Sequence, residues 1–94
     1  MIYTKATKYK VKDEKMKGFV DYLYVFVKKA RMETQNLSFE YGLNDHDEVV
    51  VIQRWSSIQD EIDFANKPEF KKELETLEKM AKEVTTLYSF TTIK

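Results

Sequence analysis

The chain has 94 residues, which fits one compact domain, and no cysteine, which excludes disulfides, thiolate metal sites and cysteine nucleophiles. Its 16 basic residues balance 16 acidic ones, so no net charge attracts nucleic acid or an anionic membrane. Because no apolar run approaches the roughly 18 residues that span a bilayer, and residues 1–10 lack the apolar core of a signal peptide, we expect a cytoplasmic protein without a membrane partner.

The first two predicted elements are a strand and a long amphipathic helix. Residues 2–11, IYTKATKYKV, are rich in β-branched and aromatic side chains, which is typical of a strand. The helix is expected within residues 12–34, where apolar side chains recur at helical spacing. These form one stripe of seven residues: Met16, Phe19, Val20, Leu23, Phe26, Val27 and Ala30.

Residues 36–55 predict an antiparallel hairpin. Its strands, 36–43 and 48–55, flank the polar sequence NDHD, which is typical of a turn. We interpret His46 in that turn as a turn residue and not a metal ligand, since adjacent side chains rarely converge on one ion. In the middle of the first strand, we expect Glu40 to pair with Arg54 across the hairpin; the alternative is a buried base with a raised pKa.

The remaining residues predict two helices and a final strand. Ser56 or Ser57 caps a short helix over residues 58–66, and Pro68 begins the next helix. That helix lies within residues 68–84, and residues 84–94 form the last strand. The order βαββαβ predicts a ferredoxin-like α+β fold, with one four-stranded antiparallel sheet and helices on one of its faces. The apolar stripe of the second long helix consists of Phe70, Leu74, Leu77 and Ala81.

The strand over residues 48–55 is apolar on both of its faces. Val49 and Val51 point to one side, whereas Val50 and Ile52 point to the other. Two helices cover only one face of a four-stranded sheet, and an uncovered apolar face usually marks an interface. We therefore predict a homodimer in which the same face of a second copy packs about a two-fold axis. The alternative is that loops or the final strand cover this face within one chain.

Several short motifs in order give the chain a family resemblance. The initial MI, then KVKDEK, LSFEY, RW followed by SS, and NKPEFKKEL together resemble the antibiotic biosynthesis monooxygenase family of dimeric α+β barrels, over nearly the whole chain. The resemblance implies one domain over residues 1–94, a homodimer, and oxygenation of phenolic or quinol substrates without a cofactor. Other members of the family degrade heme or isomerise small sugar-like signals, so the fold alone does not give the function.

The family's site residues are only partly present in this chain. Trp55 corresponds to the tryptophan of the RW motif, which lines the pocket in oxygenating relatives; the alternative role is a core aromatic. Val51 stands where some of those relatives have an asparagine, and Gln53 lies on the same face and can replace it. Phe64 and Glu69 occupy positions at which many relatives have a histidine, so two potential general bases are missing.

The residue set of the heme-degrading relatives is also missing. Its asparagine, tryptophan and heme-ligating histidine correspond to Ala6, Phe64 and Leu74 in this chain. We therefore predict no heme binding.

Two functions follow from this sequence. The first is a cofactor-independent monooxygenase that acts on a small aromatic or quinol substrate in a dry apolar pocket. The second is a non-catalytic small-molecule-binding or stress-related dimer. The missing histidines and asparagine favour the second function, whereas the retained tryptophan and the many aromatic residues favour the first. No catalytic residue is assigned, and no metal or cofactor is expected. The predicted substrate-binding residues are Trp55, Val51, Gln53, Phe64, Phe39 and Tyr41.

Overall fold

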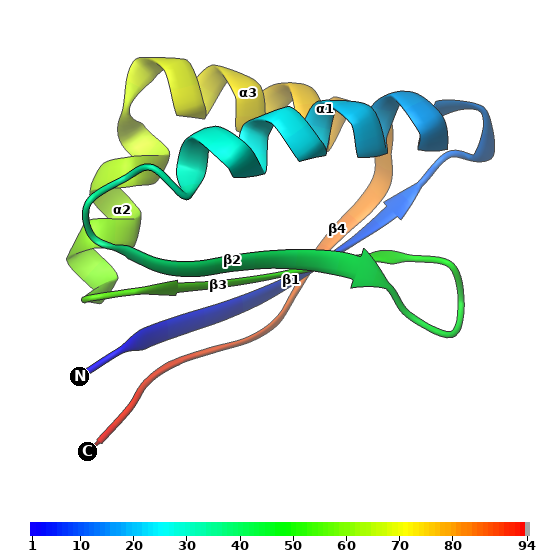
Figure 1. Ribbon diagram of the computed structural model, residues 1–94. Coiled ribbons are helices and arrows are strands. Elements are labelled where there is room, and N and C mark those ends of the chain that lie inside the picture. Colours follow the sequence, from blue (N-terminus) through cyan, green and yellow to red (C-terminus); the bar gives the residue numbers. More distant parts are fainter. Residues whose placement is uncertain (94) are drawn as a thin grey trace.

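The computed structural model describes residues 1–93 and contains a four-stranded antiparallel sheet, with α1 and α3 packed on one face (Figure 1). The strand order is β2-β3-β1-β4, and this arrangement confirms the predicted ferredoxin-like α+β fold. Within these residues, no helix is both long and apolar enough to cross a membrane. The elements are β1 (Tyr3–Val11), a short 3-10 helix (Asp13–Lys15), α1 (Met16–Ala30), β2 (Asn36–Leu43), β3 (Val49–Trp55), α2 (Ile58–Asn66), α3 (Pro68–Met80) and β4 (Ala81–Thr91).

Local sequence signals set the starts of α2 and α3. The Ser57 hydroxyl accepts a hydrogen bond from the backbone N–H of Asp60 at 3.2 Å, which caps α2 as predicted. Pro68 is the first residue of α3, where its missing N–H is not needed. In α1, the predicted stripe packs on the sheet, and the side chains that it buries completely are Phe19, Leu23, Phe26, Val27 and Ala30.

The end of α3 differs from the prediction. The helix stops at Met80, and β4 already begins at Ala81, three residues earlier than the sequence indicates. Strand pairing explains the difference, because Ala81 lies opposite Val11 and Glu83 lies opposite Lys10 in the ladder between β1 and β4. The backbone of residues 81–83 thus pairs with β1, and this strand pairing outweighs the helical propensity of Ala81, Lys82 and Glu83.

The predicted ion pair between Glu40 and Arg54 is wrong. The register places Glu40 opposite Ile52, and Arg54 opposite Ser38, so the two charged residues are not cross-strand partners. Both charged side chains are exposed, so neither requires a partner.

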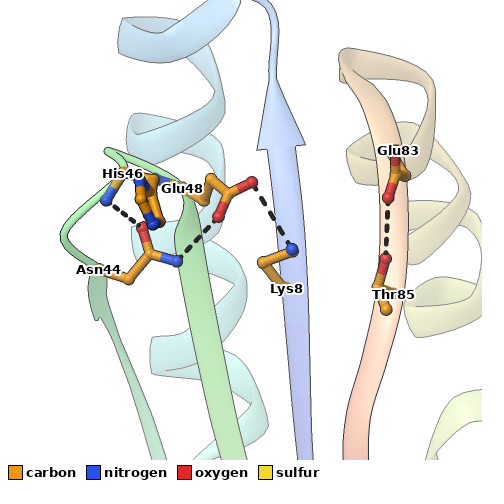
Figure 2. A network of polar contacts seen from close by, with 6 residues as sticks. All are labelled: Lys8, Asn44, His46, Glu48, Glu83 and Thr85. Atoms are coloured by element: carbon orange, nitrogen blue, oxygen red, sulfur yellow. Dashed lines mark hydrogen bonds and ion pairs between the residues drawn. The ribbon is translucent and has the colours of Figure 1, made fainter.

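The predicted turn between β2 and β3 is confirmed. The Asn44 side-chain oxygen accepts hydrogen bonds from the backbone N–H groups of His46 and Glu48, each at 2.9 Å. Asp47 adopts a φ of 58°, in the left-handed region that aspartate tolerates in turns. The Asn44 amide also donates to the Glu48 carboxylate, which lies 3.6 Å from the Lys8 ammonium on β1 (Figure 2).

The two faces of β3 have different surroundings. Val49, Val51, Gln53 and Trp55 are buried under the helices, on what we call the covered face. Val50 and Ile52 are half-buried and Arg54 is exposed, on what we call the open face. The predicted alternation is therefore confirmed. The covered face carries an aromatic core with ring centroids 4.5–6.3 Å apart, formed by Phe26, Phe39, Trp55, Phe64 and Phe70.

Candidate functional site

A cavity of about 480 Å³ lies between the covered face of the sheet and helices α2 and α3. Its inner end is lined by buried side chains from β1, β3 and α2, namely Thr7, Tyr9, Gln53, Glu61 and Phe64. Its outer end is lined by exposed side chains from α3 and β4, namely Lys71, Glu75, Glu78, Val84 and Thr86. The cavity therefore opens to solvent between α3 and β4, and it becomes more enclosed toward β3. This size and shape suit a small organic ligand.

Trp55 fixes the side-chain amide of Gln53 at the inner end of the cavity. The indole N–H of Trp55 donates to Gln53 Oε1 at 2.8 Å, and both side chains are buried. Because an indole N–H can only donate, the atom facing it must be the amide oxygen, and the orientation of the amide is unambiguous. The amide nitrogen, Nε2, makes no hydrogen bond within residues 1–93 and remains available to a ligand in the cavity.

A second polar group at the inner end is the carboxylate of Glu61. Glu61 projects from α2, is only 8% exposed, and lies 3.9 Å from the ammonium of Lys5 on β1. That distance permits charge attraction but is too long for a hydrogen bond. The cavity thus contains a buried acceptor close to a cation.

Tyr9 adds a hydroxyl to the wall of the same cavity. Burial, and secondarily the nearby negative charge of Glu78, raise the pKa of Tyr9 to about 12. The phenol is therefore protonated at neutral pH and acts as a hydrogen-bond donor or acceptor, not as a base.

Phe64 separates this cavity from a smaller hollow of about 270 Å³. The Phe64 ring lines both spaces, and its centroid lies 4.6 Å from that of Trp55. Trp55 lines only the smaller hollow, together with the loop over residues 32–35. It is 1% exposed, so the ring fills the core while its N–H acts on Gln53. The two roles considered for this tryptophan, core aromatic and site residue, are thus compatible.

The predicted substrate-binding residues occupy three kinds of position. Gln53 and Phe64 line the larger cavity, and Trp55 stands behind them. Val51 and Phe39 are buried in the core of the covered face, and Tyr41 is half-buried at the edge strand β2. Substrate binding by these residues stays a prediction.

Two ionisable side chains at the cavity, Lys5 and Glu61, were not singled out from the sequence. For Glu61 a signal was present, because it lies three residues before Phe64 and four before Ala65, on the inward stripe of α2. A carboxylate within an apolar stripe indicates a polar feature under the helix. No comparable local signal marks Lys5, because β1 contains three lysines, at positions 5, 8 and 10.

The two positions at which many relatives have a histidine, Phe64 and Glu69, place no proton-transfer group at the inner end of the cavity. Phe64 occupies one of them and lines the cavity, whereas Glu69 is exposed on α3. Within residues 1–93, no three histidine, aspartate or glutamate side chains converge as a metal site. The ionisable groups of the cavity are therefore Lys5, Tyr9 and Glu61 inside and three α3 side chains at its mouth.

Comparisons with known proteins agree with this architecture. Residues 2–76 match the family described as antibiotic biosynthesis monooxygenase. No curated protein matches the sequence.

Solved structures share the fold. A protein of Nitrosomonas europaea assigned as an antibiotic biosynthesis monooxygenase superposes with a TM-score of 0.87 at 13% identity, covering 98% of this chain and 90% of that one. A crystal structure of an antibiotic biosynthesis monooxygenase gives 0.86 at 13% identity, over 100% of both chains. A conserved protein of Methanosarcina mazei gives 0.82 at 13% identity, over 92% of this chain and 90% of that one. At these identities the likeness shows the fold alone.

Proposed function

The chain belongs to the antibiotic biosynthesis monooxygenase family, and on that premise we propose that it is a cofactor-independent monooxygenase of a small aromatic or quinol substrate. The substrate binds in the 480 Å³ cavity between the sheet and helices α2 and α3. The observation that carries this proposal is the orientation of the Gln53 amide. Trp55 holds the amide oxygen, so the N–H₂ group of Gln53 is free at the inner end of that cavity.

In such a reaction the substrate supplies all the electrons. In an anthrone-type substrate a ring CH₂ group becomes C=O, one atom of O₂ enters the product, and the other leaves as water with the two hydrogens of the CH₂ group. A hydroquinone likewise takes one oxygen atom to give a hydroxyquinone, and the other oxygen atom leaves as water with two of its hydrogens. The protein then has to bind the ring, exclude water, and stabilise negative charge as it develops on oxygen. Phe64 offers an apolar surface to the ring, and the Gln53 N–H₂ group donates to the oxygen that becomes negative.

The test is oxygen consumption with a panel of hydroquinones and anthrone-type substrates. We expect uptake that saturates with substrate concentration and product with one oxygen atom from O₂. Gln53→Leu removes the donor, and we expect kcat to fall about 100-fold while the domain stays folded. The matched control is Gln59→Leu on the exposed side of α2, which should leave the rate unchanged.

Trp55→Phe tests the role of the indole separately. The variant keeps an aromatic ring in the core but leaves the Gln53 amide free to rotate. We expect weaker ligand binding by isothermal calorimetry with little change in fold. If affinity and rate are unchanged in Trp55→Phe, the tryptophan is only a core residue and the Gln53 donor is not part of the site.

The alternative function, ligand binding without chemistry, rests on one specific observation. No histidine lies at the cavity, because the chain's single histidine, His46, is in the turn between β2 and β3. Under this alternative, the same ligands bind saturably, as detected by the fluorescence of the single tryptophan, but no oxygen is consumed.

We also propose that the protein is a homodimer in which the open faces of two sheets pack together. Support comes from the apolar side chains on that face: Tyr88 and Phe90 on β4 are 44% and 51% exposed, and the register aligns Tyr88 with Ile52 across Ala6 of β1. β4 contains no buried residue among its 11, which is unusual for a strand in a small domain. Sedimentation equilibrium at micromolar concentration should give twice the 11.2 kDa chain mass, and a stable monomer would contradict the proposal.

A further inference from the structure

We infer that Glu61 sets the substrate class of the cavity, by accepting a hydrogen bond from an aromatic hydroxyl. The cavity then prefers neutral hydroxylated aromatic molecules and rejects those that carry a carboxylate. This inference rests on the proposed function of the cavity and names the chemistry of its ligand.

The first observation is that the Glu61 side chain is largely buried while its carboxylate has no hydrogen-bond donor from the protein. Its side chain is 11% exposed, and no donor within residues 1–93 is hydrogen-bonded to it. In those residues no fully buried side-chain nitrogen or oxygen atom lacks a partner, so the unpaired Glu61 oxygens are accessible, and Glu61 lines the cavity. A carboxylate in a poorly solvated position needs donors, and the cavity is where a donor can be placed.

The ion pair with Lys5 does not remove this need. Lys5 Nζ is 3.9 Å from Glu61 Oε2, which compensates charge but satisfies no oxygen lone pair. A buried ion pair with poor geometry is weak evidence of a structural role, because desolvation offsets much of its attraction. A ligand hydroxyl that donates to Glu61 supplies the missing hydrogen bond.

The arrangement of donors and acceptors fits an aromatic ring with hydroxyl groups. Glu61 accepts, whereas the Gln53 N–H₂ group and the Tyr9 hydroxyl can donate. Phe64 lines the same inner end and offers its ring as an apolar surface. A hydroxyl that donates to a carboxylate also makes its ring more electron-rich, and this favours transfer of electrons to O₂ in the proposed reaction.

The charges on the cavity wall act against anionic ligands. Three carboxylates line the cavity, those of Glu61, Glu75 and Glu78, against the two ammonium groups of Lys5 and Lys71. A carboxylated aromatic that enters the inner end places its charge against Glu61, which leaves two like charges in a poorly solvated space.

The experiment uses three probes and the intrinsic fluorescence of Trp55, with calorimetry as a second measurement. Hydroquinone has donors, 1,4-dimethoxybenzene has the same ring without donors, and 4-hydroxybenzoate adds a negative charge. For the unaltered protein, we expect hydroquinone to bind at least about 10-fold more tightly than either of the others, as expected for one charge-assisted hydrogen bond.

Two variants identify the group responsible. Glu61→Gln removes the charge and keeps the shape; we expect it to lose about 10-fold in hydroquinone affinity and to bind 4-hydroxybenzoate more tightly. Asp63→Asn removes one charge from the same helix but lies outside the cavity, and it should leave all three affinities unchanged. A folded Glu61→Gln protein with unchanged affinities would overturn the inference.

If Glu61→Gln fails to fold, binding of the three probes by the unaltered protein still tests the inference. Equal affinity for hydroquinone and dimethoxybenzene, or no binding of hydroquinone, would then overturn it. If hydroquinone binds in a Glu61-dependent way but no oxygen is consumed, the inference about Glu61 is supported and the proposed monooxygenase activity is rejected. The failure of the inference and the failure of the proposed function are therefore distinguishable.

Discussion

The two faces of the sheet have similar apolar side chains but different surroundings. Along β3, Val49 and Val51 are buried beneath the helices, whereas the neighbouring Val50 and Ile52 are only half-buried on the open face. The covered face contains the aromatic core and the cavity. The open face has an apolar end with Tyr88 and Phe90, and a charged end with the contacts of Lys8, Glu48 and Glu83 (Figure 2). This difference shows that hydrophobicity alone does not place a residue in the core, because a helix or another element must also cover that residue.

The largest expected effect is the loss of the Trp55 side chain on the covered face. Trp55→Ala leaves a cavity among packed rings and should lower the free energy of unfolding by about 3–5 kcal/mol. Ile52→Ala on the open face should lower it by clearly less at protein concentrations at which the protein is monomeric. Urea denaturation of both variants tests the comparison, and equal losses would show that the two faces are not as different as their burial indicates.

The next effect concerns the proposed dimer. Ile52→Glu places a charge on the open face and should weaken dimerisation at least about 100-fold, because burying an unpaired carboxylate is unfavourable by several kcal/mol. Val25→Glu is the matched control, since Val25 is 54% exposed on α1. Sedimentation velocity should show monomers only for Ile52→Glu. Dimers of both variants would place the interface elsewhere.

A smaller effect of alkaline pH should arise from the covered face. Tyr9 has a folded-state pKa of about 12 against an ordinary value of 10.0, so between these pH values the folded state keeps a proton that the unfolded state loses. The free energy of unfolding is therefore unaffected by Tyr9 below pH 10 and falls as pH rises toward 12, by about 2–3 kcal/mol.

Two phenylalanine variants isolate this tyrosine. Tyr9→Phe should remove the part of the alkaline fall in the free energy of unfolding that Tyr9 causes. Tyr88→Phe on the open face should leave that part unchanged. Urea denaturation between pH 9 and about 12 measures both. An unchanged pH dependence in Tyr9→Phe would contradict the buried phenol.

The smallest effect is expected in the turn at the charged end of the open face. Asn44→Ala removes the acceptor of two backbone N–H groups and should lower the free energy of unfolding by about 1–2 kcal/mol. The hydrogen bond from Asn44, followed by the charges of Lys8 and Lys10, lowers the pKa of the Glu48 carboxyl. The variant should therefore also raise that pKa toward its ordinary value, as measured by NMR. Asp45→Ala in the same turn serves as the control and should change neither quantity.

Short-range patterns in the sequence were enough to predict the elements and the faces that they bury. The alternation along β3, the apolar stripe of α1, the cap at Ser57 and the helix start at Pro68 all depend on residues within a few positions of one another. Such short-range patterns need no knowledge of the partner element. They were sufficient for the βαββαβ order, and with the short motifs they indicated the family.

The pairings between elements could not be predicted in this way and follow from the packed structure. The register of β2 against β3 separated Glu40 from Arg54, and the ladder between β1 and β4 ended α3 at Met80. Packing of α2 against β3 and α3 brought Glu61 near Lys5 of β1. The direction of the indole N–H toward Gln53 likewise follows from the packed core. These features depend on how distant segments meet, and a strand or helix with the same periodicity allows many such registers.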